Sequence, residues 1–203
     1  MNLSDLSDMQ LDALIEIGNI GAGHAVTALS NLVGRVIRLE VPTIEILDIT
    51  DMPDLFGGAE QLAGAVFARI EGQIDGAVMF IAAPESIRTI VEMLGETPAA
   101  PENTPDERLA GILVEVARLL IDSYLRAVTE ITGLESSAPD LAWAYDMAGA
   151  LIEAVVAEIG LVADQAVLVR TSFIDKDLAV VAPFLFVPDP DSLEAILSRL
   201  GLA

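Results

Sequence analysis

The sequence predicts an α+β fold in which two similar halves share one central antiparallel sheet, with long helices packed against it. Three observations lead to this fold class: long stretches with the apolar spacing of helices, apolar strand-like runs between them, and a segment that occurs twice. The chain has 203 residues, of which 53% are hydrophobic, and this is enough for one domain with a sizeable core. We therefore expect a single domain over residues 1–203, built from repeats over about 1–96 and 106–203.

The repeated segment ends each half. Pro84-Glu85-Ser86-Ile87 matches Pro190-Asp191-Ser192-Leu193, and the match continues without a gap to Gly95 and Gly201. Each copy has proline in its first helical turn, an acidic residue next and glycine after its last turn, and these are start and stop signals of a helix. Two unrelated amphipathic helices could agree by chance, but so many like-for-like residues favour a pseudo-twofold internal duplication.

The other elements follow from periodicity. Each half opens with a long helical pattern, over residues 8–32 and 106–132, whose apolar residues recur at the spacing of one buried face. The second half also contains a helical segment over residues 142–159 that the first half lacks. A proline-rich polar segment over residues 96–107 separates the halves and predicts a linker. Strand-like runs fill the remainder, and we expect them to join in one sheet: residues 36–49, 62–70, 77–83, 165–174 and 178–187.

Charge and composition exclude several classes of function. The chain has 32 acidic and 10 basic residues, a net charge of −22, one histidine and no cysteine. Nucleic acid and anionic membranes need a basic surface, so we expect neither as a partner. A thiolate nucleophile is excluded, and no metal site is expected. Self-repulsion weakens in concentrated salt, where the Debye length is about 3 Å at 1 M, so the composition predicts a halophilic protein. A mesophilic protein that happens to be acidic is the alternative.

The beginning of the chain carries no sign of export. Asp5 and Asp8 stand where a signal peptide would have basic residues followed by an apolar run. No stretch is apolar for long enough to span a membrane. We therefore expect a cytoplasmic protein.

The first long helix carries the residues with the most evident chemistry. Asp12, Glu16 and Asn19 are spaced i, i+4, i+7, so they share one helix face. Ordinary solvated surface often has such a stripe. An asparagine amide is both donor and acceptor and can orient a water molecule, which suits phosphoryl transfer, where positioning contributes more than deprotonation. A glutamate one turn away can accept a charge-assisted hydrogen bond from a partner's lysine or arginine.

Glycines in the same helix make the stripe unusual. Gly18, Gly21 and Gly23 each cost about 1 kcal/mol relative to alanine in a helix interior. A helix face without side chains lets another surface come very close. Either close packing inside the protein or a partner that docks over the stripe could require them. The single histidine, His24, lies about 80° round the helix from Glu16, and we expect a packing or surface role for it.

These residues resemble the motif of the CheC/CheX/FliY family of chemotaxis phosphatases, and CheC most of all. That motif is Asp or Ser, three residues, Glu, two residues, Asn, and a proline after 22 more; here Asp12, Glu16, Asn19 and Pro42 match it. The string GNIGAGHAVTALS is also similar to CheC, and the resemblance covers the whole chain. We expect Pro42 to have a structural role at the start of an edge strand.

The resemblance implies an enzyme that hydrolyses the aspartyl phosphate of a CheY-type response regulator. Glu16 would pair with a lysine of that receiver, Asn19 would place the attacking water in line, and Asp12 would be auxiliary. The resemblance also implies that the Mg²⁺ of the reaction belongs to the receiver, so that this chain has no cofactor of its own.

A second copy of the motif in the second half is degenerate. Glu115 occupies the glutamate position, but Arg118 stands in place of asparagine, Gly111 in place of Asp or Ser, and Leu141 in place of proline. Arginine has no acceptor to offer a water molecule. We therefore expect a second site that is not catalytic, although it could bind a partner through Glu115.

Two alternatives stay open at this point. The flagellar switch proteins are similar in fold and only bind partners, so the chain could be a non-enzymatic adaptor for CheY or CheD. A ligand-binding regulator is disfavoured, because no nucleotide-type glycine loop follows a strand. The segment over residues 142–159 would either cover the core or, by the resemblance, help to bind CheD. The internal duplication removes one reason to dimerise, and we expect a monomer.

Overall fold

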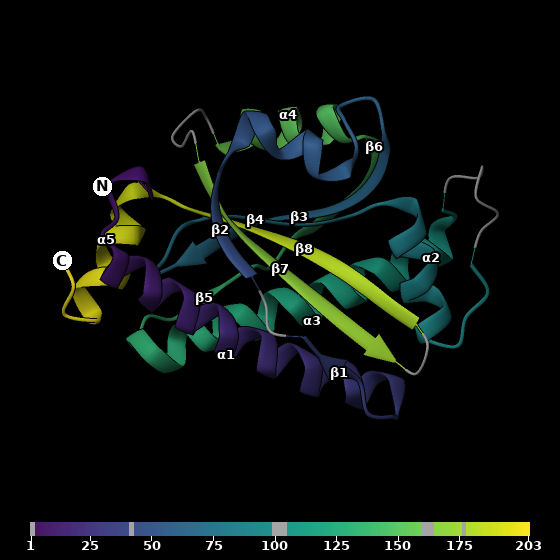
Figure 1. Ribbon diagram of the computed structural model, residues 1–203, viewed down its shortest axis with the longest axis horizontal. Coiled ribbons are helices and arrows are strands. Elements are labelled where there is room, and N and C mark those ends of the chain that lie inside the picture. The colour runs from purple at the N-terminus through teal and green to yellow at the C-terminus, as the bar shows by residue number, and fades with distance from the viewer. Residues whose placement is uncertain (1–2, 41–42, 99–104, 160–164, 176–177) are drawn as a thin grey trace.

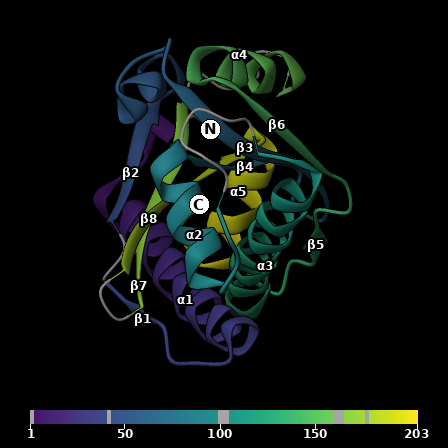
Figure 2. The same ribbon diagram turned by 90° about the vertical axis from the view of Figure 1, so that its right-hand side faces the viewer.

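The computed structural model describes residues 3–40, 43–98, 105–159, 165–175 and 178–203. An eight-stranded sheet forms its centre, and helices cover both faces (Figures 1 and 2). The strand order is β1-β7-β8-β4-β3-β5, with β2 also paired to β7 and β6 to β3, and the strand pairs are antiparallel. The α+β prediction is therefore confirmed.

The elements of the two halves follow one another in the same order. The first half consists of η1 (Leu3–Asp5), α1 (Asp8–Val33), β1 (Arg38–Leu39), β2 (Thr43–Asp48), η2 (Ile49–Phe56), β3 (Leu62–Gly72), β4 (Gly76–Ala82) and α2 (Pro84–Met93). The second half consists of α3 (Glu107–Thr132), β5 (Ser136–Ser137), β6 (Leu141–Met147), α4 (Ala148–Ile159), β7 (Gln165–Asp175), β8 (Leu178–Pro188) and α5 (Pro190–Arg199). Strand pairs join the halves throughout the sheet: β4 pairs with β8 at the centre, β1 and β2 pair with β7, and β5 and β6 pair with β3. A duplicated unit would have this order; the duplication itself stays a prediction.

The helix predicted over residues 142–159 is wrong in its first part. Six of these residues, 142–147, belong to strand β6 (Leu141–Met147), which pairs with β3 along its whole length, and α4 begins only at Ala148. Exposure alternates along β6 as it does in a half-buried strand, with Trp143 and Tyr145 turned to the buried side. In the first half, a 3₁₀ helix, η2, lies between β2 and β3.

The core has two layers, one on each face of the sheet. Two buried clusters lie between the sheet and helices α1, α2, α3 and α5. A third lies on the opposite face, where η2 and α4 pack; Figure 2 shows α4 on that side of the sheet. Leu151 and Ile152 of α4 are buried there, so this helix covers part of the core.

Local signals fix the ends of the two long helices. Ser7 and Gln10 form a capping box at the start of α1, and Asp106 caps α3 by accepting a hydrogen bond from the Leu109 amide. Both helices end at a glycine in the left-handed conformation, Gly34 and Gly133. The helices lie side by side and run in opposite directions (Figure 1). No helix in the described ranges is long and apolar enough to cross a bilayer.

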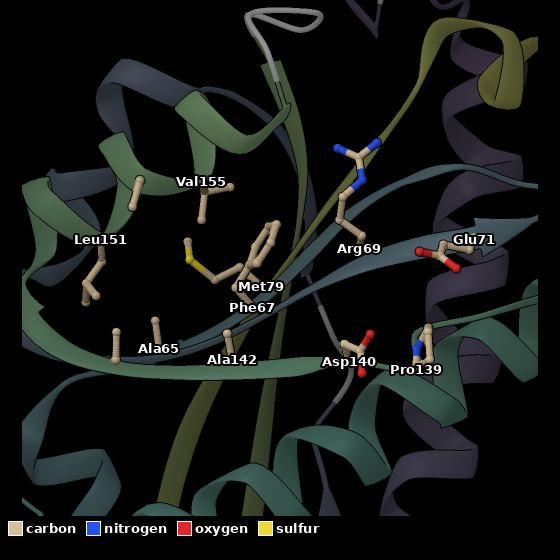
Figure 3. Close-up of a pocket in the computed structure, with 12 residues that line it drawn as sticks. Ala65, Phe67, Arg69, Glu71, Met79, Pro139, Asp140, Ala142, Leu151 and Val155 are labelled. Atoms are coloured by element: carbon tan, nitrogen blue, oxygen red, sulfur yellow. The ribbon is translucent and has the colours of Figure 1, made fainter.

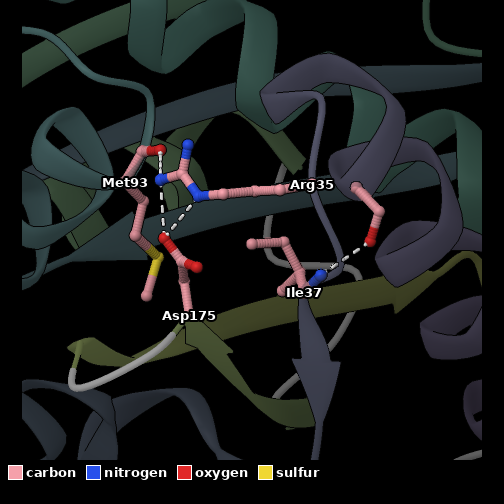
Figure 4. A network of polar contacts seen from close by, with 5 residues as sticks. Arg35, Ile37, Met93 and Asp175 are labelled. Atoms are coloured by element: carbon pink, nitrogen blue, oxygen red, sulfur yellow. Dashed lines mark hydrogen bonds and ion pairs between the residues drawn. The ribbon is translucent and has the colours of Figure 1, made fainter.

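A polar network anchors the C-terminal end of α1 (Figure 4). The Arg35 guanidinium donates to Asp175 Oδ2 from Nε at 2.8 Å and from Nη2 at 2.6 Å, and also to the Met93 carbonyl at 2.5 Å. The Asp175 side chain is only 4% exposed. Beside it, the Ile37 amide donates to the Ser30 hydroxyl. The network ties α1 to the end of α2 and to the end of β7, so the helix is held firmly against the sheet.

Candidate functional site

The structure brings Asp12, Glu16 and Asn19 together on the solvent side of α1. Asp12 and Glu16 are exposed and Asn19 is half-buried. The opposite side of the helix supplies the buried residues, Leu14, Ile17, Gly18, Gly21, Ala22, Ala25 and Leu29. The three polar side chains therefore form one stripe on the outside of the molecule.

The stripe has no internal hydrogen-bonding role. Within the described ranges, no hydrogen bond or ion pair holds the side chains of Asp12, Glu16 or Asn19. Polar groups with a structural role usually have partners inside the protein. The carboxylates and the amide are therefore available to another molecule.

The three glycines of α1 have different surroundings. A Cβ at Gly21 would lie 2.3 Å from Tyr124 Cδ1, and one at Gly18 would lie 2.1 Å from Ile44 Cδ1. Tyr124 is stacked on Phe184 with ring centroids 4.5 Å apart, which leaves its ring little room to move. A Cβ at Gly23 would meet nothing within 4 Å. Internal packing thus accounts for Gly18 and Gly21, whereas Gly23 faces open space beside the stripe.

His24 connects α1 to α3 and does not join the stripe. Its Nε2 lies 3.3 Å from Glu130 Oε2, and Glu130 also accepts a hydrogen bond from Arg126 Nε at 2.9 Å. The Nδ1 atom is buried without a hydrogen-bond partner. These contacts fit the expected packing role of the histidine.

The second stripe, on α3, has a different charge pattern. Gly111, Glu115 and Arg118 are exposed along one face of this helix, followed by Asp122. Partial burial raises the pKa of Asp122, while the nearby Arg118 guanidinium acts to lower it. Arg118 thus stands beside a carboxylate where α1 has an amide. The α1 sequence has no lysine or arginine, whereas α3 has three arginines among its acidic residues.

Two expectations about the candidate site, the role of Pro42 and the place of the metal ion, stay predictions. Pro42 lies outside the described residues, immediately before β2 begins at Thr43. In the described part of the chain, no three His, Asp or Glu side chains are gathered closely enough to hold a metal ion. The expectation that Mg²⁺ belongs to the receiver stays a prediction.

Two cavities lie on the face of the sheet that η2 and α4 cover, and no pattern in the sequence predicted them. The first, of about 500 Å³, lies between α4 and the sheet, with apolar walls and with Arg69, Glu71 and Asp140 at one end (Figure 3). The second, of about 650 Å³, lies between η2 and α4. Both depend on how distant elements pack together, so periodicity could not reveal them.

Comparison with known proteins gives consistent matches. A family model described as the CheC-like family matches residues 9–46. A Bacillus subtilis (strain 168) protein named CheY-P phosphatase CheC is 33% identical over 205 residues, which cover 97% of this chain and 96% of that protein. The crystal structure of Thermotoga maritima FliY has a TM-score of 0.71 at 19% identity and covers 97% of this chain and 98% of that one.

A second solved structure extends the likeness in fold. The FliM middle domain from H. pylori has a TM-score of 0.65 at 12% identity and covers 96% of this chain and 99% of that domain. At such identities the two solved structures show the fold alone. The Bacillus subtilis sequence is alike along nearly the full length of both chains.

Proposed function

Because the chain belongs to the CheC-like family, we propose that it is a phosphatase that removes the phosphoryl group from a CheY-type response regulator. The relative named CheY-P phosphatase CheC supports this activity. The observation that carries the proposal is the exposed stripe on α1, where Glu16 and Asn19 face solvent without internal partners.

Asn19 orients the water in this proposal. The water oxygen attacks the phosphorus, the bond from phosphorus to the receiver's aspartate oxygen breaks, and inorganic phosphate and a free carboxylate result. The amide oxygen accepts a hydrogen bond from the water and the amide nitrogen can donate one, so one side chain fixes the direction of attack. No strong base is needed, because positioning and charge stabilisation dominate phosphoryl transfer.

Glu16 sets the register of docking. It lies three residues before Asn19, about 4.5 Å along the helix axis, and its exposed carboxylate can pair with a receiver lysine. Asp12, one more turn away, adds negative charge on the same face and has the auxiliary role. A helix held at both ends keeps these groups in one geometry, which favours reaction.

The proposal also covers the metal ion and the second stripe. The metal ion that neutralises the phosphoryl charge belongs to the receiver. The α3 stripe does not hydrolyse the phosphate, because Arg118 can only donate hydrogen bonds. A monomeric state in the cytoplasm and an interaction with CheD remain predictions from the sequence.

The experiment follows the lifetime of the phosphorylated receiver. The cognate CheY-type receiver is labelled with radioactive acetyl phosphate, and its decay is measured over a range of protein concentrations. We expect Asn19→Ala to lower the maximal acceleration by roughly 10²-fold and Glu16→Gln mainly to raise KM. Glu92→Gln, at an exposed position on α2, is the control and should leave both parameters unchanged.

Two outcomes would contradict parts of the proposal. If Asn19→Ala, still folded by circular dichroism, accelerates decay as the native protein does, then Asn19 does not position the water. If the native protein binds the phosphorylated receiver but leaves its lifetime unchanged, then the chain is an adaptor and not an enzyme.

A further inference from the structure

Met9 is a large apolar side chain that the structure leaves in solvent. Its exposed fraction is 66%, and it lies in the first turn of α1. Isolated exposed hydrophobic residues are common on protein surfaces, so exposure alone says little. The exposure of Met9 becomes relevant to docking because Met9 lies next to the stripe.

Met9 continues the stripe of the candidate site. It precedes Glu16 by seven residues, which places it within about 20° of Glu16 around the helix and about 10 Å away along the axis. Asp12, also exposed, lies between them. From Met9 to Asn19, the solvent-facing side of α1 is therefore one continuous surface with an apolar end.

The turn that carries Met9 is fixed and not frayed. The Ser7 amide donates to Gln10 Oε1 at 2.8 Å, and Gln10 Nε2 donates to the Leu202 carbonyl at 2.8 Å. The start of α1 is thus tied to the C-terminal segment of the chain. The exposure of Met9 is consequently a constant property of this surface.

The size of a protein interface brings Met9 within reach of the receiver. Even a small specific complex buries about 600 Å² on each partner, which is a round patch with a radius of about 14 Å. This exceeds the distance of about 10 Å from Glu16 to Met9 along the helix. A receiver contact centred on Glu16 therefore covers both Asn19, about 4.5 Å away along the axis, and Met9.

We propose that Met9 is a docking residue, buried in an apolar spot of the phosphorylated receiver when Glu16 binds the receiver's lysine. The proposal rests on the proposed function and adds a specificity-determining contact to it. The α1 face is acidic and has no lysine or arginine, so the matching receiver surface is basic with an apolar spot beside it. The unbranched methionine side chain adapts readily to such a spot.

Kinetics of receiver dephosphorylation test the contact. Removing the buried part of one methionine side chain should raise KM roughly tenfold in Met9→Ala, with kcat unchanged because Met9 does not touch the phosphoryl group. Met9→Leu, which keeps the apolar volume, should retain the native KM. Val36→Ala is the matched control: Val36 is 81% exposed and lies 20 residues beyond Glu16, outside the patch.

A binding measurement separates failure of this proposal from failure of the proposed function. The phosphorylated receiver is titrated with the Asn19→Ala protein and with the Asn19→Ala, Met9→Ala protein, neither of which should hydrolyse it. A roughly tenfold higher Kd for the double variant supports the docking role, even if the native protein proves not to be a phosphatase. Equal Kd values, or a fall in kcat at unchanged KM in Met9→Ala, overturn it and leave the phosphatase proposal standing.

Discussion

Gly21 and Gly23 lie on the same helix two residues apart, and only the first is explained by the fold. Gly21 admits the Tyr124 ring, whereas Gly23 has open space where a Cβ would be. A glycine in a helix interior costs about 1 kcal/mol relative to alanine. No contact within the described residues explains Gly23, and in the proposed function this position lies beside the surface that the receiver approaches.

Alanine at Gly23 should stabilise the protein and weaken docking. We expect Gly23→Ala to raise the free energy of unfolding by up to about 1 kcal/mol and to raise KM for the phosphorylated receiver several-fold, because the added methyl group stands in the docking surface. Urea denaturation and receiver dephosphorylation measure the two effects. A stabilised variant with native KM would show that the receiver does not come close to this position.

Gly21→Ala is the matched variant with the opposite expectation. Overpacking against the stacked Tyr124 ring costs about 1–3 kcal/mol, and about 1 kcal/mol of helix propensity is regained. The free energy of unfolding should therefore fall by up to about 2 kcal/mol, measured by the same urea titration. A variant about 1 kcal/mol more stable than the native protein would mean that α1 and α3 make room for the added methyl group without loss.

The sequence predicted those helices whose ends and buried faces are determined by nearby residues. The long helices were expected over residues 8–32 and 106–132 and are found over Asp8–Val33 and Glu107–Thr132, because caps and apolar spacing act within a few residues. Strand β6 was missed, since its alanines suit a helix and its pairing with β3 is not visible locally. The 3₁₀ helix η2 was missed as well.

The candidate site, too, could be predicted from local geometry only in part. The shared face of Asp12, Glu16 and Asn19 follows from helix geometry alone, and the structure places them on that face. Tertiary contacts decide the rest. Ile44 and Tyr124 determine which glycines are needed inside the protein, and no local pattern could show that Met9 stays exposed.

We expect the polar contacts of Arg35 to hold the C-terminal end of α1 in place, and a substitution at Asp175 tests this. Asp175→Asn removes the charge from a side chain that is 4% exposed, and Arg35 then loses its charged partner beside the Met93 carbonyl. We expect a clear fall in Tm, because the two hydrogen bonds from the Arg35 guanidinium that tie the end of α1 to β7 lose their charged acceptor. Glu96→Gln, which breaks the exposed pair with Arg108, is the control and should cost at most about 1 kcal/mol. Equal effects of the two substitutions would contradict the anchoring role.

The net charge of −22 predicts that salt has opposite effects on the stability of the fold and on the affinity for the receiver. Folding brings the carboxylates together, and ion pairs with arginine, such as Arg35–Asp175, Arg108–Glu96 and Arg126–Glu130, offset only part of their repulsion. In the proposed function, a basic receiver face is attracted to the acidic α1 stripe, and the same screening weakens that attraction. Stability should therefore rise with ionic strength while affinity for the receiver falls.

Thermal unfolding between 0.05 M and 1 M NaCl tests the first response. The Debye length shrinks from more than about 10 Å to about 3 Å over this range, and relief of about 2 kcal/mol of repulsion would raise Tm by about 4–8 °C in a chain of this size. A variant with Glu60→Gln, Glu92→Gln and Glu194→Gln, all exposed positions, should show a smaller rise, because it has less charge to screen. A Tm that is flat or falls with salt in the native protein would mean that repulsion does not limit its stability, and the interpretation of the acidic composition as salt adaptation would then be wrong.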